Sequence, residues 1–481
     1  MPLWSAAIPP LLDYPNHLAR CFVLAHLNDP AYSFSKFYRS DWGLYPYLGM
    51  DASLVPLLRL FPVETAGRVF LSLCVVAFPA AAWFFLHEVN PGEDLMALWA
   101  LLVAYNIFFL EGMLNFDLSL AVGFLTLGLW LRWLKRPTTA RWVATLVAFT
   151  ALYFAHLLGF GIIGFVVVAY LAFGRRPVRE WIWTGALALP GIAFYMHSSR
   201  VGLGKQAVVF RGFVEKLSAI GSLLHSYWLL LDWISFALIG VFFLAAWWRN
   251  SEFRWNGRWL GVAASLCVLF LAIPWAWGDG SDLDIRVLPV LFVVLFATFR
   301  AGRRLRWLAV IPVLLFAAQI VSVARYFELA QPELKGLALS LDSAPRGALV
   351  LPVVEGDQYP AERAFTHFWA YGVIRRGWFS PYLFDTPGET PMRIVHNSYT
   401  PDGFWDLTYD QEPDWKQVQS DYDYVWAYGV PRFSPGLANI GDLVYSYGAL
   451  EVYRLHKSPV AVAEGLGSRF RSERHLYPVL K

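Results

Sequence analysis

Long apolar runs alternate with short polar loops between about residue 66 and residue 324. A helix that crosses a bilayer needs about 20 mostly apolar residues, with a range of roughly 17 to 25. The pattern predicts ten such segments, at about 66–87, 95–110, 114–134, 142–157, 159–173, 181–197, 227–248, 259–277, 284–299 and 307–324. We therefore expect a mostly α-helical, polytopic transmembrane bundle.

Residues 142–173 allow two interpretations, one long helix or two short spans that meet at the sequence HLLGFG. A single helix of about 32 residues would be roughly 48 Å long. With two spans, all four arginine-rich loops fall on one side of the membrane; these loops are 132–141, 174–180, 248–258 and 299–306. Lysine and arginine mark the cytoplasmic side, which favours the split and assigns these loops to the cytoplasm.

The first 65 residues are predicted to be an external loop, because they fall on the side of the membrane opposite the four basic loops. Two amphipathic stretches in this loop, at 13–26 and 47–61, are typical of helices that lie in the membrane interface. The opening sequence MPLWSAAIPPLLDY has no basic residue and is interrupted by Pro9 and Pro10, so it is neither a signal peptide nor a span. We infer a further helix before residue 1, lost through a late start codon or a fragmentary chain.

Residues 325–481 follow a different pattern, with frequent prolines, aspartates and tyrosines and no run long enough to span a membrane. Stretches 347–354, 421–430 and 443–456 resemble strands, and 362–377 a helix ending at Gly377. We expect a small external α/β domain. Its conspicuous aromatic residues are expected mainly to pack its core, with sugar stacking as the alternative: Trp369, Tyr371, Trp378, Tyr382, Trp405 and Trp426.

Composition strengthens the membrane interpretation and removes several function classes. The chain of 481 residues is 57% hydrophobic and only 16% charged, whereas a soluble protein carries about 25% charged residues. The net charge of +3 comes from loop-sized arginine clusters, which do not form a nucleic-acid face. Three cysteines suggest no disulfide framework. Because no glycine-rich phosphate loop is present, a nucleotide-sugar donor bound from the cytoplasm is disfavoured.

Five short motifs stand in the first loop or at the external ends of spans: DYPNHLAR (13–20), LGMD (48–51), EGMLNFDLSLAVGF (111–124), FAHLLGFG (154–161) and DIRVLP (284–289). Together they resemble GT-C glycosyltransferases, in particular bacterial members of that superfamily. The resemblance implies about eleven spans, with an external C-terminal domain. It also implies transfer of a hexosyl or pentosyl group from a polyprenyl-phosphate donor to an acceptor hydroxyl on the periplasmic face of the bacterial inner membrane. The acceptor would be a cell-envelope glycan, lipid or protein.

Within this resemblance, Asp13 is the candidate general base that takes the proton of the acceptor hydroxyl as the anomeric bond forms. His17 lies one helical turn further on and would hold that carboxylate in place. Asp51, on the second interfacial helix, is a second candidate acid. The alternative is that Asp13 only caps a short helix and His17 lies on its surface.

The leaving lipid phosphate requires a cation or fixed N–H donors. Arg286 is the first candidate and Arg20 the second, although arginines at helix ends also commonly snorkel to the interface. Asp284 would orient Arg286 or help to hold a divalent cation. Mg²⁺ or Mn²⁺ would suit such oxygen ligands, but the sequence does not require a metal.

Three further polar residues are predicted to line the substrate site from the external ends of spans: Asn115, Asp117 and His156. Polar groups inside a membrane bundle are costly and often functional. For Asp117 a charge–dipole contact in the first turn of a helix, worth about 0.3–1 kcal/mol, is a sufficient alternative.

Two other classes of function compete with the enzyme. One is a transporter or flippase of lipid-linked saccharides, which would show internal repeats and broken helices near the membrane midplane. The chain shows no repeat, and its ionisable residues gather at the ends of spans. The other is a non-catalytic membrane assembly protein. The sequence favours the enzyme.

Overall fold

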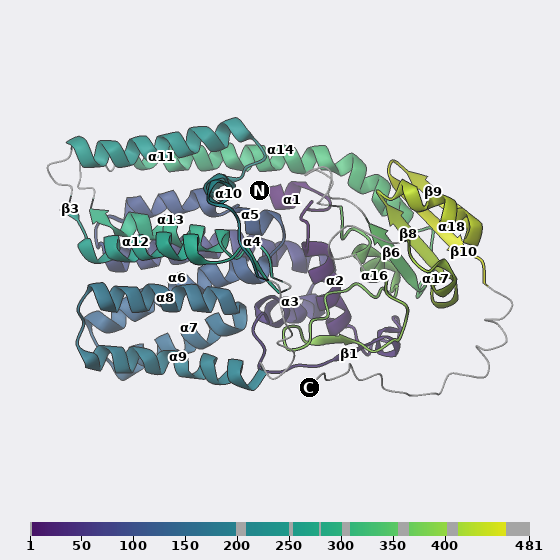
Figure 1. The fold of residues 1–481 in the computed structure, drawn as a ribbon, viewed down its shortest axis with the longest axis horizontal. Helices are drawn as coiled ribbons and strands as arrows, with labels where there is room; N and C mark the ends of the chain where they lie inside the picture. Colours follow the sequence, from purple (N-terminus) through teal and green to yellow (C-terminus); the bar gives the residue numbers. More distant parts are fainter. Residues whose placement is uncertain are drawn as a thin grey trace.

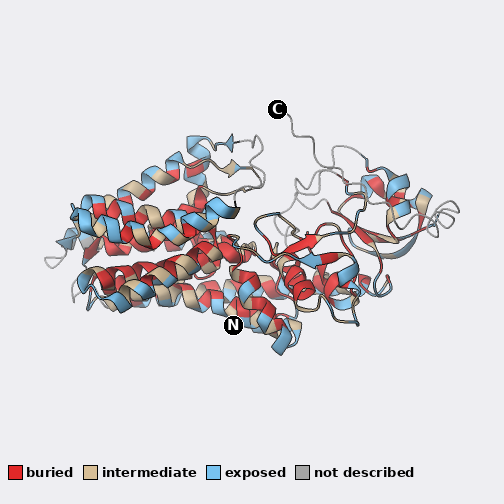
Figure 2. Cartoon of the chain, turned by 90° about the horizontal axis from the view of Figure 1, so that it is seen from below, coloured by how far each residue is buried: buried red, intermediate tan, exposed pale blue. Residues whose placement is uncertain are grey.

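The computed structural model describes residues 2–198, 208–249, 254–278, 280–300, 308–354, 365–401 and 412–457. Figure 1 shows a bundle of long helices at one end of the molecule and a smaller α/β region at the other. Buried residues run through the interior of both parts (Figure 2). The predicted fold class, a polytopic helix bundle with a small C-terminal α/β region, is confirmed.

The bundle follows the predicted apolar runs closely. Its helices are α4 (Val63–Val89), α6 (Leu114–Lys135), α7 (Thr139–Ala155), α8 (Leu157–Phe173), α9 (Val178–Ser198), α11 (Leu229–Arg249), α12 (Gly257–Ala272), α13 (Leu288–Ala297) and α14 (Val310–Ser340). The run at 95–110 is broken into a 3₁₀ helix, η2 (Asp94–Val103), and the short α5 (Ile107–Leu110).

Among the described residues, α4, α6 and α14 are long and apolar enough to cross a membrane. A fourth span is possible where α10 (Phe213–Ala219) and η3 (Ile220–Leu224) precede α11 with a bend of 98°. Several other predicted spans are shorter apolar helices of 10–17 residues. The bundle thus contains the helices of an integral membrane protein, although fewer of them have full spanning length than the sequence predicted.

The predicted break within residues 142–173 is confirmed at His156. Its backbone is extended (φ −167°, ψ 128°), so it ends α7 and starts α8. Its amide donates to the carbonyl of Leu152, and its Nδ1 accepts from the amide of Leu158 at 3.1 Å. One residue therefore caps both helices.

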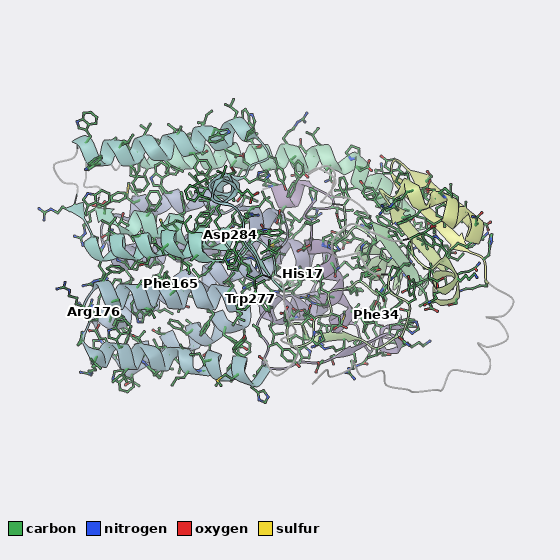
Figure 3. All side chains as sticks on the ribbon, in the orientation of Figure 1. His17, Phe34, Phe165, Arg176, Trp277 and Asp284 are labelled. Carbon is green, nitrogen blue, oxygen red and sulfur yellow. The ribbon has the colours of Figure 1, made fainter. Side chains whose placement is uncertain are left out.

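The described parts of the four basic loops lie at one end of the bundle, as predicted. Strand β3 (Arg254–Trp255) pairs with β5 (Phe299–Arg300), and Arg258 donates to the hydroxyl of Tyr170 at 2.7 Å. Figure 3 places Arg176 at this end, and His17 and Asp284 near the end that faces the C-terminal region. The assignment of the basic end to the cytoplasm remains a prediction.

The N-terminal segment comprises α1 (Pro2–Ser5), α2 (Tyr14–Ala25), η1 (Phe34–Lys36), β1 (Tyr38–Ser40) and α3 (Gly49–Leu60). The sequence predicted that α2 would lie in the membrane interface with one face exposed. Instead α2 is buried along nearly its whole length, because it packs against α3 on one side and α16 (Ala370–Arg376) on another (Figure 1). This correction matters for the site, since α2 begins at Asp13.

The C-terminal region is built on a four-stranded sheet in the order β6-β8-β10-β9. Strands β6 (Val350–Val354) and β8 (Tyr424–Tyr428) are parallel, whereas β10 (Leu450–Leu455) is antiparallel to β8 and to β9 (Gly441–Tyr447). Every residue of β6 is buried, as its uninterrupted apolar sequence suggests. Three short helices lie in the same part of the chain as the last strands of this sheet: α17 (Trp415–Asp421), η6 (Pro431–Phe433) and α18 (Ser434–Ile440).

Three boundaries in this region differ from the prediction. The stretch 443–456 forms a hairpin, β9–β10, which turns at Gly448 with φ of 56°. Helix α14 continues to Ser340, past the expected boundary at 325. Helix α16 ends before Gly377 as expected, but it begins only at Ala370, and residues 355–364 lie outside the described residues.

The conspicuous aromatic residues of the region pack its core, as expected. Trp369, Tyr371, Trp378, Tyr382 and Trp426 are all buried, and Trp405 lies outside the described residues. Strand β7 (Met392–Ile394) pairs with β1 and so joins the C-terminal region to the N-terminal segment. Two small elements complete the site end: the β2 (Val208–Val209) and β4 (Ala276–Trp277) pair, and η4 (Ile285–Val287).

Candidate active site

Asp13 is fixed by its backbone at the point where α2 meets the turn between α5 and α6. Its amide donates to the carbonyl of Glu111 at 2.9 Å. The next residue of the turn, Gly112, has φ of 80°, and a Cβ placed on it would lie 2.6 Å from the amide nitrogen of Tyr14. A side chain therefore has no room there, and glycine permits both the conformation and the close approach.

The Asp13 carboxylate faces a histidine from the C-terminal region. Its Oδ1 lies 3.4 Å from Nε2 of His367, and the Asp13 side chain is 22% exposed. On the other side of that ring, Nδ1 lies 3.3 Å from Nδ2 of Asn16. Because an amide nitrogen donates, Nδ1 is the acceptor and the proton of the neutral ring is on Nε2, towards Asp13.

Asn16 is itself held firmly, and it was not predicted as a site residue. Its Nδ2 also donates to the carbonyl of Tyr382, and its Oδ1 accepts from the amide of Phe384, both at 2.9 Å. The side chain is completely buried. The N-terminal segment and the C-terminal region therefore hold His367 together.

His17 does not have the role that its spacing predicted. Its ring packs on Phe384 with centroids 4.6 Å apart, and its buried Nδ1 has no hydrogen-bond partner among the described residues. Burial, with Arg20 and His367 nearby, lowers the pKa of His17 well below its usual value, so it is neutral. The His17 ring packs on Phe384 of the C-terminal region, and His367 makes the contact to Asp13 instead.

Arg286 lies in η4 at the same end of the bundle and is 9% exposed. Its Nη1 is 3.0 Å from Nε2 of His156. Its Nη2 donates to the carbonyl of Ser281 at 3.1 Å and contacts Sδ of Met113 at 3.4 Å. The guanidinium also lies over the ring of Phe116, 5.2 Å from its centroid. The surroundings of this cation are thus largely apolar.

The hydrogen bonds of Arg286 are incomplete. A neutral imidazole has one donor and one acceptor nitrogen, and Nδ1 of His156 already accepts from Leu158. Its Nε2 then carries the proton and cannot accept from Arg286. Nε of Arg286 is buried and has no partner in the part of the chain that the structure describes. Within the described residues, no carboxylate forms an ion pair with Arg286, which leaves a buried cation with unused donors.

One short turn connects Asp13 to Arg286. Glu111 bonds to Asp13 at one end of the turn, and Met113 contacts Arg286 at the other. Asp13, Glu111 and Asp282 all lie within electrostatic reach of Arg286. The structure therefore brings together the predicted residues Asp13, His156 and Arg286. Sequence reasoning missed Glu111 as a member of this group, although the motif EGML placed an acid at that turn.

Asn115 contributes to the site by positioning the start of α3. Its Oδ1 accepts from the amide of Met50 at 2.7 Å. This places Tyr47, which has a positive φ of 69°, with its ring 4.5 Å from that of His156. Asn115 was predicted to bind substrate, whereas its observed contact is structural.

Arg20 and Asp51 require a correction. Nε and Nη2 of Arg20 donate to the two carboxylate oxygens of Asp51 at 2.9 and 2.7 Å. The two side chains are 1% and 0% exposed. This two-point pair joins α2 to α3 and uses the groups that were predicted to bind phosphate and to act as an acid. Both residues therefore serve the fold.

Asp117 and Asp284 are also occupied by neighbouring side chains. Oδ1 of Asp117 accepts from Nδ2 of Asn106 at 2.6 Å, which links α6 to the cap of α5. Asp284 pairs with Arg211 at 3.0 Å and Lys216 at 3.5 Å, and it does not contact Arg286. The predicted substrate-binding role of Asp117 and the predicted orienting role of Asp284 do not fit these contacts.

The divalent cation, Mg²⁺ or Mn²⁺, stays a prediction. In the part of the chain that the structure describes, no three His, Cys, Asp or Glu side chains are grouped so that they could hold a metal ion. Asp284, the residue predicted to help hold Mg²⁺ or Mn²⁺, is paired with two basic side chains.

The fold, a helical bundle with a buried N-terminal helix packed against an α/β region, is similar to that of two solved structures, both of ArnT from Cupriavidus metallidurans. The apo structure has a TM-score of 0.54 and 11% identity, and covers 92% of this chain and 93% of that one. The structure bound to undecaprenyl phosphate has a TM-score of 0.54 and 12% identity, with 92% and 94% covered. No protein-family model and no curated protein matches the sequence.

Proposed function

We propose that this protein is a membrane glycosyltransferase that moves a sugar from a polyprenyl-phosphate donor to an acceptor hydroxyl. The observation that carries the proposal is Arg286, a buried cation with unused donors, joined to Asp13 by a single turn. A buried cation of this kind is stabilised by an anionic ligand. The similar ArnT structure with bound undecaprenyl phosphate supports a lipid phosphate as that anion.

The acceptor half of the reaction belongs to Asp13. Its partly exposed carboxylate takes the proton of the acceptor hydroxyl as the hydroxyl oxygen bonds to the anomeric carbon. The Nε2 proton of His367 points at the carboxylate and fixes its orientation. A base held in this way is already in position when the acceptor binds.

The leaving-group half belongs to Arg286. As the bond between the anomeric carbon and the phosphate oxygen breaks, its electron pair passes to the polyprenyl phosphate. The unused donors of Arg286 would stabilise that charge by hydrogen bonds in an apolar setting, where fixed donors are most effective. The ring of His156 lies on one side of the guanidinium, with Nε2 3.0 Å from Nη1.

The direction of the site follows from the basic loops at the other end of the bundle. Since lysine and arginine favour the cytoplasmic side, the site opens to the periplasmic side of a bacterial inner membrane. The acceptor there is a cell-envelope glycan, lipid or protein, and the transferred group a hexose or pentose.

The test is a transfer assay with the purified full-length chain, a radiolabelled polyprenyl-phosphate sugar and a panel of acceptors. We expect Asp13→Asn to lower the transfer rate at least about 100-fold, because general-base catalysis contributes roughly 10²–10⁴-fold. Asp29→Asn is the matched control, since Asp29 is a more exposed acid of the same segment that bonds only to its neighbours Ala31 and His26.

Two results would contradict the proposal. Equal activity of Asp13→Asn and the wild type would remove Asp13 from the mechanism. Accumulation of a lipid-linked saccharide in proteoliposomes, without any transfer product, would favour a transporter.

A further inference from the structure

A narrow cleft, open to solvent on one side, lies between the start of α2, the first turns of α4 and the helix α16. Two cations, one acid and two tyrosines line it: Arg68, Arg375, Glu64, Tyr14 and Tyr371. None of these residues belongs to the candidate active site.

Arg68 is held in place from one side. Its Nη2 donates to the carbonyls of Ala6 and Ala7 at 2.9 and 3.0 Å, and the guanidinium lies 5.9 Å from the ring centroid of Trp4. Within the described residues, its Nε and Nη1 have no hydrogen-bond partner. The guanidinium is therefore held through Nη2, and its Nε and Nη1 donors are left for a ligand in the cleft.

Tyr14 and Tyr371 supply two further donors. Both rings are buried, and neither hydroxyl has a hydrogen-bond partner among the described residues. Burial raises the pKa of each tyrosine well above its usual value, so both hydroxyls keep their protons. Tyr371 also lies beneath the guanidinium of Arg375 at 5.8 Å.

The cleft lies at the level where lipid headgroups are expected. Residues Glu64 and Arg68 are in the first two turns of α4, one of the helices long enough to cross a membrane. Large apolar side chains are exposed beside it: Trp4 at 48%, Leu60 at 74% and Phe61 at 45%. Exposed aromatic side chains at the end of a span are typical of the membrane–water interface.

We propose that this cleft binds the headgroup of a phospholipid that carries both a phosphate and an amine. The phosphate would accept from Arg68 and Arg375, because a guanidinium matches phosphate geometry. Glu64 would repel a simple anion but suits the ammonium of a phosphoethanolamine headgroup. Such a lipid would join α4 of the bundle to α16 of the C-terminal region. The site does not depend on the proposed glycosyl transfer.

Binding is tested on the delipidated full-length chain by native mass spectrometry, titrated with dihexanoyl-phosphatidylethanolamine. We expect the wild type to bind one molecule of dihexanoyl-phosphatidylethanolamine, and to bind it more tightly than it binds dihexanoyl-phosphatidylglycerol. Arg375→Gln should weaken binding about tenfold, as expected for loss of one charge-assisted hydrogen bond. Since Arg375 is exposed, this variant leaves the core intact. Glu64→Gln should remove the preference for the amine-bearing lipid.

Arg59→Gln is the matched control, because Arg59 is an exposed arginine on the neighbouring α3 that does not line the cleft. It should bind as the wild type does. Equal binding of dihexanoylglycerol, which has no phosphate, would overturn the proposal, as would unchanged binding by Arg375→Gln. Equal binding of glycerophosphoethanolamine, which has no acyl chains, would show that the source is a free phosphate compound and overturn the lipid assignment.

Discussion

Two buried arginines, one in the N-terminal segment and one in the helical bundle, differ in how completely their hydrogen bonds are satisfied. Arg20, between α2 and α3, forms a two-point pair with a carboxylate that is itself fully buried. Arg286, just before α13, faces an imidazole nitrogen that cannot accept from it, and its buried Nε has no partner among the residues that the structure describes. The sequence alone made both of them candidates for holding phosphate.

The difference teaches that completeness of hydrogen bonding, more than burial, separates a structural cation from a ligand-binding one. A paired buried charge has its desolvation offset inside the fold. For an unpaired buried charge, the desolvation cost is offset only when a ligand of opposite charge binds. The same criterion separates Asp51 from Asp13, whose carboxylate is partly exposed and held at only one oxygen.

The largest effect is expected at the buried pair of Arg20 and Asp51. Asp51→Asn leaves the buried Arg20 without a counter-charge, which costs about 3–5 kcal/mol of stability. Thermal unfolding in detergent would detect this as a marked fall in Tm. The double variant Arg20→Met with Asp51→Leu should recover most of the loss. If Asp51→Asn were as stable as the wild type, the pair would not have the structural role given to it here.

At Arg286 we expect a loss of activity and little loss of stability. Arg286→Gln should lower sugar transfer about 100- to 1,000-fold, as expected when a fixed donor to a developing charge is removed. Its Tm should fall much less than that of Asp51→Asn, since no ion pair is broken within the described residues and the main loss is the bond to the carbonyl of Ser281. Transfer rate and Tm are measured on the same preparation. A fall in Tm comparable with that of Asp51→Asn would abolish the distinction between the two arginines.

The smallest effect tests how His367 is held. Asn16→Leu removes the donor to Nδ1 of His367 at nearly the same side-chain volume, so neither ring nitrogen is fixed as the one that carries the proton. We expect about a tenfold loss of transfer. Transfer rate and Tm are measured on the same preparation, because the variant also loses the bonds to Tyr382 and Phe384. An unchanged transfer rate would show that the hydrogen bond of Asn16 to His367 has no part in the reaction.

The helices were predictable because their signal is local. Apolar runs of nearly constant length gave the bundle, and the polar break at His156 gave the division between α7 and α8. The arrangement of the basic loops followed from the same pattern. The burial of α2 was not predictable, since the residues that cover it are in α16, far along the chain.

The candidate site was predictable in part for the same reason. Asp13, His156 and Arg286 stand out as polar residues at the ends of apolar runs. Their partners do not, because Asn16 and His367 are 351 positions apart. The i+4 spacing favoured His17 as the partner of Asp13, and the packing of its ring on Phe384 overrode that local preference.

The absence of a side chain at Gly112 has a consequence for the candidate active site. A Cβ at this position would lie 2.6 Å from the amide nitrogen of Tyr14 and 2.9 Å from that of Asp13, which is too close for the backbone to stay where it is. Any larger residue in this turn would therefore displace the proposed base, Asp13, relative to Arg286.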